Sequence, residues 1–378
     1  MRILVLGAGL QGSACTYDLL MEEDVEAVTL ADLRPESAAS FLPESEKLTK
    51  VEADFGDEEA MRALMAGHHI VLSAAPYYFN ATLASATIDA GCHFSDLGGN
   101  TEIVREQIAL SDRAERAGVT IVPDVGLAPG MVNVLAAEGV RRFERPKRVR
   151  MYVGGLPRHP KPPLDYQVVY SLEGVLDYYT APSFVLEDGE TREVEALSEV
   201  ETVEFDELGE LEAFHTAGGA SLQPWELADR VDSLFYKTLR YPGHATIMRA
   251  IRGLGLLGED PVRVGGVDIV PRDVFIACAG PVLRKPDEPD VVALRVVVEG
   301  DRDGAPASLT FDVLDYADET TGISAMERTT GFTLSIVGLF LGRGVITERG
   351  TLPSYRAIPY GPYVKSLAAR GIEVKERP

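Results

Sequence analysis

Short apolar runs alternate with segments of helical spacing over the first third of the chain. The runs show little polar alternation, which is typical of parallel strands that are buried on both faces. They lie at residues 2–6, 26–31, 48–53, 69–73, 92–95 and 119–122. Between them, apolar residues recur at helical intervals, as at Cys15, Leu19 and Leu20. Strands separated by helices in this way predict a doubly wound parallel sheet of the Rossmann type.

The pattern changes near residue 124. A helix is predicted from residue 131 to about 142, and β-rich segments follow it at 148–153, 167–170, 184–187, 291–299 and 308–314. Acidic runs at 187–190 and 199–212 are predicted to be solvated. Two more helices are expected at 325–340 and about 362–369. The second half therefore predicts a mixed sheet with interposed helices.

These patterns predict an α/β protein of two packed domains. The N-terminal Rossmann domain, with its doubly wound parallel sheet, is expected to comprise residues 1–128 and about 322–378, because the last helices are predicted to return to it. A central α/β domain with a mixed sheet is expected at residues 129–321. The chain shows neither an internal repeat nor a low-complexity linker between them.

Composition and charge exclude several classes of protein. No apolar run approaches the roughly 20 residues that span a bilayer, and the first residues do not resemble a signal peptide. We therefore expect a cytoplasmic protein that does not bind membranes. The formal net charge of −23 argues against a nucleic-acid partner. The cysteines, Cys15, Cys92 and Cys278, are widely spaced and odd in number, so we expect buried thiols, and neither a disulfide framework nor a metal site.

A glycine motif follows the first predicted strand. Gly7, Gly9 and Gly12 form a G-x-G-x-x-G segment that opens a helix, which is the context that a dinucleotide-binding loop requires. In that loop the first glycine permits the turn, the second lets the pyrophosphate approach the backbone, and the third allows close helix packing. We expect the pyrophosphate over Gly9, Leu10 and Gln11, at the helix N-terminus.

Other cofactor contacts are expected at the carboxyl ends of the strands, where open α/β sheets bind ligands. Asp32 lies 20 residues after Gly12, where a carboxylate accepts hydrogen bonds from the adenosine ribose, and it favours NAD over NADP. Arg34 is able to pair with a 2′-phosphate, so NADP stays open. Asp54 ends the third strand, and its carboxylate either contacts the adenine amino group or only begins the following loop. The small residues that end the fourth strand leave room for the cofactor: Ser73, Ala74, Ala75 and Pro76.

Five further segments carry a resemblance to a known family. They are Ala74-Ala75-Pro76-Tyr77-Tyr78, Asp96-Leu97-Gly98-Gly99-Asn100, Gly126-Leu127-Ala128-Pro129-Gly130, Ser171-Leu172-Glu173-Gly174 and Arg240-Tyr241-Pro242-Gly243-His244. With them the chain resembles the saccharopine dehydrogenase (reductase) superfamily, and within it the lysine 6-dehydrogenase branch. The resemblance implies further cofactor contacts at Gly98 and Gly126. It also implies a homodimer, with the central domain binding substrate and joining the subunits.

The resemblance implies an oxidoreductase that acts on the carbon–nitrogen bond of an amino acid. Members of the family make or break such bonds through an imine and a nicotinamide hydride. The lysine 6-dehydrogenase branch implies NAD-dependent oxidative deamination of L-lysine at the ε-carbon. Saccharopine reductase and carboxynorspermidine dehydrogenase chemistry remain as alternatives. A non-catalytic NAD(H)-binding sensor and an assembly scaffold are the alternatives from other classes.

Three residues are candidates for catalysis. An ammonium substrate must lose a proton before hydride leaves its carbon, so a positioned base is expected. Asp96 ends the fifth strand at the cofactor edge. Its carboxylate either binds or deprotonates the substrate ammonium, or it caps the turn that follows the strand. Tyr77 either donates a hydrogen bond near the nicotinamide or packs. His244 follows a Pro-Gly turn, where its side chain either reaches the cleft and transfers a proton or has a structural role in the turn.

Three residues are candidates for holding the substrate. Arg240 and Lys237 are expected to bind the carboxylate, Arg240 in a bidentate manner, with solvated surface charges as the plainer interpretation. Glu173 is expected to bind the α-ammonium, or else to be an ordinary exposed acid. Tyr178, Tyr179 and Trp225 are assigned to packing.

Overall fold

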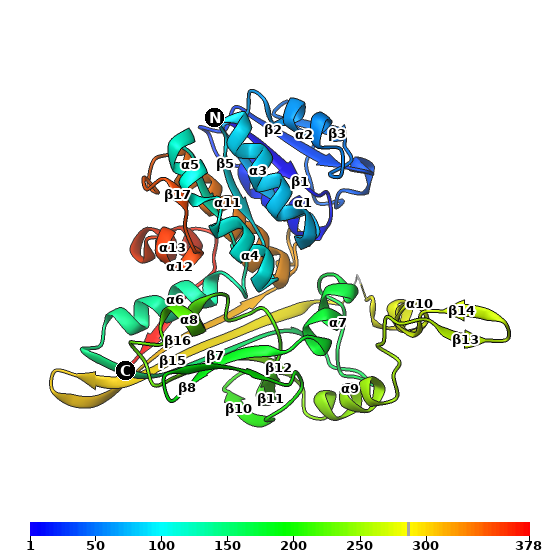
Figure 1. Ribbon diagram of the computed structural model, residues 1–378, viewed down its shortest axis with the longest axis vertical. Coiled ribbons are helices and arrows are strands. Elements are labelled where there is room, and N and C mark those ends of the chain that lie inside the picture. The colour runs from blue at the N-terminus through cyan, green and yellow to red at the C-terminus, as the bar shows by residue number, and fades with distance from the viewer. Residues whose placement is uncertain (286–287) are drawn as a thin grey trace.

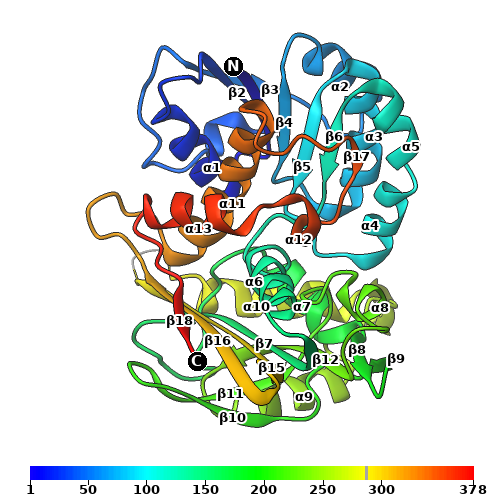
Figure 2. The same cartoon turned by 90° about the vertical axis from the view of Figure 1, so that its left-hand side faces the viewer.

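The computed structural model, which describes residues 1–285 and 288–378, consists of two layers built on separate sheets (Figures 1 and 2). The first sheet has seven parallel strands in the order β17-β6-β5-β4-β1-β2-β3. Their bounds are β1 (Arg2–Leu6), β2 (Ala27–Asp32), β3 (Leu48–Glu52), β4 (Ile70–Ser73), β5 (His93–Asp96), β6 (Thr120–Val122) and β17 (Gly350–Thr351). The strand order reverses direction between β1 and β4, which is where doubly wound sheets bind their ligands.

Helices cover both faces of this sheet, as the unbroken apolar runs predict. Successive residues of β1 serve opposite faces, because side chains alternate along a strand. Ile3 and Val5 pack in the core that contains α1 (Leu10–Leu20) and α11 (Ala325–Gly342), whereas Leu4 and Leu6 pack beneath α2 (Glu58–Met65), α3 (Asn80–Ala90) and α5 (Ser111–Ala117).

The second sheet is mixed and has nine strands. Seven of them lie in the order β10-β11-β12-β7-β15-β16-β18, while β8 pairs with β12 and β9. Their bounds are β7 (Arg145–Pro157), β8 (Ser183–Glu187), β9 (Glu190–Val194), β10 (Glu201–Phe205), β11 (Gly209–His215), β12 (Ser233–Arg240), β15 (Asp290–Arg302), β16 (Ala305–Tyr316) and β18 (Lys375–Arg377). The two sheets confirm the predicted fold class.

The remaining helices link or flank the sheets. They are α4 (Thr101–Ile108), α6 (Met131–Arg141), α7 (Leu172–Thr180), α8 (Gln223–Glu226), α9 (His244–Gly253), α10 (Pro271–Leu283), α12 (Ser354–Ala357) and α13 (Tyr360–Ala368). A separate hairpin is formed by β13 (Val262–Val264) and β14 (Val267–Ile269). Within the described residues, no helix combines the length and the apolar character needed to cross a bilayer.

Two sequence-based expectations are wrong. Residues 167–170 form no strand; they lead into α7, whose N-cap is Ser171. The acidic side chains of the run at 199–212 are solvated as expected, except for the buried Glu212, and the hairpin β10–β11 that carries them also buries Phe205, Leu211 and Ala213. Cys15 and Cys92 are buried as expected, but Cys278 is exposed.

The C-terminal tail returns to the first sheet, as the sequence predicts. Helix α11 packs against α1, and β17 pairs with β6 in parallel. The last strand, β18, pairs instead with β16 of the second sheet. The tail therefore ties the two layers together, while the predicted domain limits at residues 128 and 322 stay a prediction.

A buried ion pair anchors the tail. The Arg370 guanidinium donates to Asp18 Oδ1 at 2.7 Å and to Glu22 Oε1 at 2.9 Å, and so holds the end of α13 against α1. Burial raises the pKa of Asp18, and the hydrogen bonds from Arg370 oppose that rise. Removal of Arg370 would leave a buried carboxylate without its cation.

We predict that Arg370→Ala lowers the free energy of unfolding by about 3 kcal/mol at pH 8. The deficit should shrink as the pH falls toward about 4, the ordinary pKa of Asp, because a protonated Asp18 is no longer an unpaired buried charge. Arg343→Ala is the matched control, since Arg343 pairs with Glu22 and Asp24 at the surface and should cost at most about 1 kcal/mol. Urea unfolding at both pH values measures the difference; equal losses for the two variants would contradict the buried anchor.

Candidate active site

The loop after β1 requires two of its three motif glycines for its own packing. Gly7 has a φ of +97°, and a Cβ there would lie 2.7 Å from the carbonyl oxygen of Ala74. A Cβ at Gly12 would lie 1.8 Å from the carbonyl oxygen of Gly7. Gly9 differs, because its φ is −68° and no protein atom lies within 4 Å of a Cβ built there. Nothing in the described chain fills the space over Gly9, which suits the approach of a pyrophosphate.

Asp32 is held rigidly beside this loop. Its Oδ2 accepts the backbone N–H of Ala8 at 2.8 Å, and its Oδ1 accepts that of Arg34 at 2.8 Å. The carboxylate thus lies between the glycine loop and the turn after β2. The Arg34 side chain is exposed on the same turn. The residues at this edge fit a dinucleotide, with a carboxylate fixed where the adenosine ribose is expected.

The other predicted cofactor residues occupy the carboxyl edge of the sheet. A Cβ on Gly12 would lie 3.4 Å from the Cβ of Ala74. The Ala75 N–H donates to Ser73 Oγ, and the Ser73 hydroxyl donates to Asn80 Oδ1. Leu10 and Pro76 are exposed beside them. Asp54 is exposed and accepts the N–H of Gly56, so it organises its own loop.

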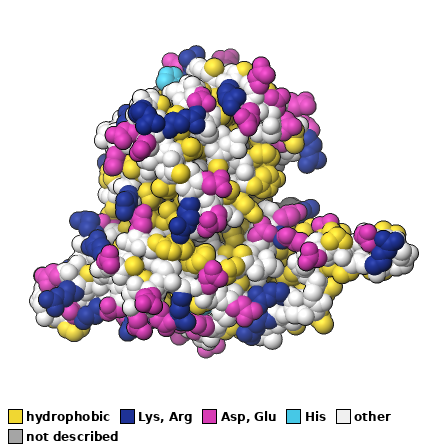
Figure 3. Space-filling model, viewed as in Figure 1, with side chains coloured by type: hydrophobic (Ala, Val, Ile, Leu, Met, Phe, Trp, Pro, Cys, Tyr) yellow, Lys and Arg dark blue, Asp and Glu magenta, His cyan; other side chains and the backbone are white. Residues whose placement is uncertain are grey.

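A cavity lies between the carboxyl edge of the first sheet and one face of the second. On the face shown in Figure 3, hydrophobic side chains gather where the two layers meet. The cavity contains about 780 Å³ of empty space, part of it open to solvent. Its lining comes from both layers and from α11: Gln11, Leu97, Gly98, Gly126, Leu127, Ala128, Pro129, Val153, Gly155, Tyr170, Tyr178, Thr216, Ala217, Tyr236, Thr238, Arg240, Met326 and Thr330.

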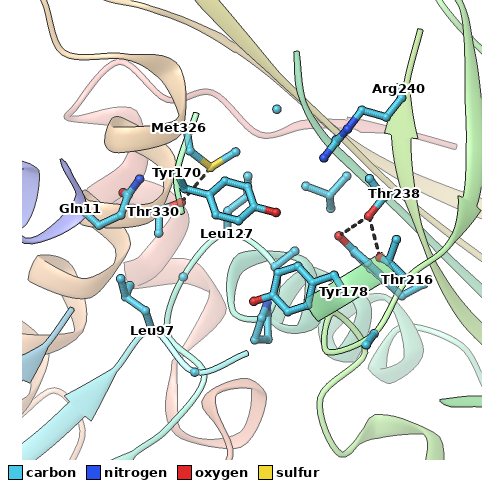
Figure 4. Close-up of a pocket in the computed structure, with 18 residues that line it drawn as sticks. Gln11, Leu97, Leu127, Tyr170, Tyr178, Thr216, Thr238, Arg240, Met326 and Thr330 are labelled. Carbon is cyan, nitrogen blue, oxygen red and sulfur yellow. Dashed lines mark hydrogen bonds between the residues drawn. The ribbon is translucent and has the colours of Figure 1, made fainter. Parts of the chain in front are cut away.

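One end of the cavity adjoins the cofactor loop. Figure 4 shows Gln11 and Leu97 on that side, with Tyr170 and Tyr178 in the middle and Arg240 opposite. Both amide atoms of Gln11 are buried and have no hydrogen-bond partner among the described residues. An unsatisfied buried amide is costly, so its position in the lining of a cavity indicates a polar ligand there.

Arg240 occupies the opposite end and is 3% exposed. Its Nε donates to the Tyr179 hydroxyl at 3.2 Å, its Nη1 donates to the Leu239 carbonyl, and its guanidinium lies 4.7 Å from the centre of the Tyr166 ring. Within the described chain no carboxylate forms an ion pair with it. Its cross-strand neighbour Glu212 instead accepts the N–H groups of Gly243 and Ala245 at the start of α9.

A chain of hydrogen bonds orients this guanidinium from the side that faces away from the cavity. Tyr179 accepts from Arg240, and its hydroxyl lies 2.9 Å from His244 Nε2, while His244 Nδ1 lies 3.3 Å from the Leu164 carbonyl. Burial and the Arg240 charge lower the pKa of His244 to about 3, so the ring is neutral at physiological pH. A proton on Nδ1 satisfies every contact: Nδ1–H donates to Leu164, and Nε2 accepts from Tyr179. The structure therefore places His244 behind Arg240 and outside the cavity lining, where it positions Arg240.

The other predicted substrate and catalytic residues lie away from the cavity lining. Lys237 points to the opposite face of β12 from Arg240, because side chains alternate along a strand, and its Nζ donates to Glu201 and to the Glu199 carbonyl. Glu173 is exposed at the start of α7. Tyr77 is half-buried beside Asp177, where burial raises its pKa. Glu173 is therefore the ordinary exposed acid of the plainer interpretation, whereas Lys237 is only 5% exposed and is not a solvated surface charge.

Asp96 is fully buried beside the cavity but turns toward α4, where Gln107 donates to it at 2.6 Å. Burial raises its pKa to about 7. A second carboxyl that the sequence reasoning missed, Asp124, lies directly against Gly98 of the lining: a Cβ on Gly98 would be 1.7 Å from Asp124 Oδ1. Asp124 accepts from Gly99 N–H and the Ser221 hydroxyl, and burial raises its pKa to about 6.

The sequence patterns also did not predict most of the hydroxyl groups that line the cavity on the side of the second sheet. Tyr236, Thr238 and Arg240 are every second residue of β12, so their side chains lie on the same face of the strand and line the cavity. The Thr238 hydroxyl lies 2.7 Å from that of Thr216, within hydrogen-bond distance. That spacing of two was visible in the sequence, but β12 itself was not predicted. Tyr178 lines the cavity although the sequence assigned it to packing, whereas Tyr179 and Trp225 do pack.

Comparisons with known proteins agree with this architecture. Two family models cover most of the chain: "Saccharopine dehydrogenase NADP binding domain" matches residues 3–122, and "Saccharopine dehydrogenase C-terminal domain" matches residues 126–372. The mitochondrial alpha-aminoadipic semialdehyde synthase of Bos taurus is 23% identical over 98% of this chain, which spans about half of that relative, 47% of its length. The carboxynorspermidine synthase of Vibrio alginolyticus is 23% identical over 99% of this chain and 96% of its own.

A solved structure shares the whole fold. The apo saccharopine dehydrogenase (L-Glu forming) of Saccharomyces cerevisiae superposes with a TM-score of 0.82 at 21% sequence identity, covering 100% of this chain and 99% of the yeast chain. At this identity the superposition establishes the arrangement of both sheets, and no more than that.

The glycine loop allows a matched test of the cofactor site. We predict that Gly9→Ala leaves the unfolding midpoint unchanged but weakens dinucleotide binding by at least about tenfold, or about 1.4 kcal/mol, because only the ligand meets the added methyl. Gly12→Ala should instead destabilise the fold by about 1–3 kcal/mol, because its methyl meets the backbone of Gly7. Calorimetric titration and thermal unfolding separate the two effects. Unchanged dinucleotide affinity in Gly9→Ala would refute the proposed approach of the pyrophosphate.

Proposed function

Because the chain belongs to the saccharopine dehydrogenase family, we propose that it oxidises the carbon–nitrogen bond of a free amino acid with NAD as hydride acceptor. The family places it among oxidoreductases that use a nicotinamide cofactor. The proposed substrate is L-lysine, oxidised at the ε-carbon to an imine that water then hydrolyses.

The observation that supports this substrate is the unpaired guanidinium of Arg240. A buried cation is costly without an anion, so its place in the cavity lining favours an anionic ligand group. An α-carboxylate suits the planar, bidentate geometry of arginine. With the carboxylate there, a dipolar amino acid of lysine's length extends toward Gln11 and Gly98, at the cofactor end.

The groups at the cofactor end suit an amine. Asp124, with a pKa of about 6, is negatively charged at neutral and alkaline pH and attracts an ammonium toward Gly98. Burial raises the pKa of Tyr178, so its hydroxyl stays protonated and serves as a hydrogen-bond donor in the middle of the cavity. The bound nicotinamide supplies a hydride acceptor. The residues of this chain hold both ends of the substrate, and alkaline pH supplies the uncharged amine that hydride loss requires.

NAD is proposed over NADP because of Asp32. Two backbone N–H groups fix its carboxylate beside the glycine loop, and at the proposed ribose position it would repel a 2′-phosphate. The description of the matched domain names NADP, and the exposed Arg34 side chain beside Asp32 is a suitable partner for that phosphate. NADP is therefore the second candidate, and comparison of the two cofactors belongs in every assay.

Reductive condensation of the saccharopine or carboxynorspermidine kind is the second candidate reaction, because the relatives include saccharopine dehydrogenases and a carboxynorspermidine synthase. Saccharopine carries three carboxylates. Arg240 is the one cationic side chain in the described lining, which favours a substrate with a single carboxylate.

We predict that L-lysine reduces NAD at pH 9–10, roughly where the ε-ammonium loses its proton, with a higher kcat/KM than saccharopine. Absorbance of the reduced nicotinamide measures the rate, and NADP is run in parallel. Turnover with saccharopine but not with lysine would replace the proposed reaction by the second candidate. Dinucleotide binding without turnover of any amine would instead indicate a sensor.

We predict that Arg240→Met raises KM for L-lysine by about 10- to 100-fold, because a charge-assisted hydrogen bond contributes about 1.5–3 kcal/mol. KM for NAD should stay unchanged. The diamine 1,5-diaminopentane, which lacks the carboxylate, should be oxidised equally well by both proteins. Lys237→Met is the matched control, because Lys237 lies on the opposite face of the same strand. Equal effects on lysine and on the diamine would show that Arg240 does not bind the carboxylate.

A further inference from the structure

The Arg240 end of the cavity contains a cation and hydroxyl groups but no acid. In the described part of the chain, the lining of the cavity includes no Asp or Glu, and Arg240 is its one charged side chain. Thr238 and Tyr236 lie on the same face of β12, and the Thr238 hydroxyl is 2.7 Å from that of Thr216 (Figure 4). This composition bears on the substrate, because a free amino acid carries an α-ammonium directly beside its carboxylate.

The acidic residues on the elements that border the cavity have other partners. The two carboxylate oxygens of Glu212, the cross-strand neighbour of Arg240, accept two N–H groups at the start of α9. Those of Asp290 accept two N–H groups at the start of α11. Glu173 is exposed to solvent on α7. An α-ammonium bound beside Arg240 would therefore meet no carboxylate side chain of the described lining.

The groups at this end suit an anion. The Nε and Nη1 atoms of Arg240 donate to Tyr179 and Leu239, and Figure 4 shows the guanidinium pointing toward the middle of the cavity. Burial raises the pKa of Tyr170 and Tyr236 in the lining, so their hydroxyl groups stay protonated and are able to donate to a carboxylate. An ammonium in the same place would lose its hydration and be repelled by the guanidinium. The Arg240 end therefore favours a carboxylate that has no positive charge beside it.

We infer that this site accepts straight-chain ω-amino carboxylates, which carry a carboxylate at one end, a primary amine at the other and no α-ammonium. The compound 6-aminohexanoate is L-lysine without its α-amino group. It keeps the two groups that Arg240 and the cofactor end hold, and it lacks the one group that has no partner. The inference rests on the proposed function for its chemistry and names the substrate class of that same site.

The oxidation of this substrate has the same balance of atoms and electrons as that of lysine. The carbon next to the uncharged amine gives a hydride to NAD, which becomes NADH, while the nitrogen loses one proton to water and the C=N bond forms. Water then adds to the imine carbon, and the C–N bond breaks to release ammonia and an aldehyde. This aldehyde has no α-amino group with which to cyclise, so it stays open to a carbonyl reagent.

A matched pair of unreactive ligands tests the recognition without turnover. Hexanoate and L-norleucine share the carbon chain and the carboxylate and lack the ε-amine, and only L-norleucine carries an α-ammonium. In calorimetric titration of the protein with NAD at about pH 7, where an α-amino group is charged, hexanoate should bind at least about tenfold more tightly. The preference should shrink at about pH 10, where the amino group of L-norleucine is mostly uncharged.

Two variants test whether Arg240 is the source of this preference. Arg240→Met should weaken hexanoate binding by at least about tenfold, whereas the control Lys237→Met, on the opposite face of the same strand, should leave it unchanged. L-norleucine that binds the unmodified protein as tightly as hexanoate, or hexanoate that does not bind it, would overturn the inference.

Turnover distinguishes this inference from the proposed function. At about pH 8, where the ω-ammonium groups of the two substrates are ionised to a similar extent, 6-aminohexanoate should reduce NAD with a kcat/KM at least equal to that of L-lysine. A carbonyl reagent should trap aldehyde in an amount equal to the NADH formed. A higher kcat/KM for L-lysine would overturn the inference and leave the proposed function standing. Turnover of neither amine would overturn the proposed function, and the binding of hexanoate and L-norleucine would still decide the inference.

Discussion

The buried, unpaired charge of Arg240 is the constraint on which the account of this site depends. A guanidinium removed from water loses its hydration, and only partial compensation comes from the Tyr166 ring, the Tyr179 hydroxyl and a backbone carbonyl. The cross-strand carboxylate of Glu212 caps a helix instead of pairing with it. A fold that maintains such a charge at the wall of a cavity is suited to an anion that arrives with the substrate.

The packing of the two layers places this charge opposite the proposed cofactor site. Arg240 is carried by the face of the mixed sheet, while the glycine loop and Gln11 are carried by the carboxyl edge of the parallel sheet. Helix α11 crosses from one layer to the other and contributes Met326 and Thr330 to the lining. The length of the cavity is therefore set by how the two sheets pack. Helix α10 is connected to the same side of the cavity, because its Arg272 donates to the Glu173 carbonyl of α7, the helix that carries Tyr178.

Local patterns predicted the Rossmann half almost completely, because each strand, turn and glycine there is specified by neighbours in sequence. The prediction failed where burial depends on long-range pairing. Strand β12 lies between β11 and β7, and its mixture of Lys237, Thr238 and Arg240 does not resemble a buried strand. Arg240 was identified through its motif, whereas Asp124 and Tyr178 were missed, since only the packing of the 98–99 turn places Asp124 against Gly98 and Tyr178 in the lining. His244 was predicted at the site but lies behind it, because its ring fills the core beside Phe214.

A crystal structure of the protein with NAD and L-lysine bound would test the central claim most directly. We expect the lysine carboxylate in a bidentate contact with Arg240, within about 3 Å, and the ε-carbon at the opposite end, beside the nicotinamide near Gln11 and Gly98. A lysine bound in the reverse direction, or a carboxylate held by other residues while Arg240 stays unpaired, would contradict it.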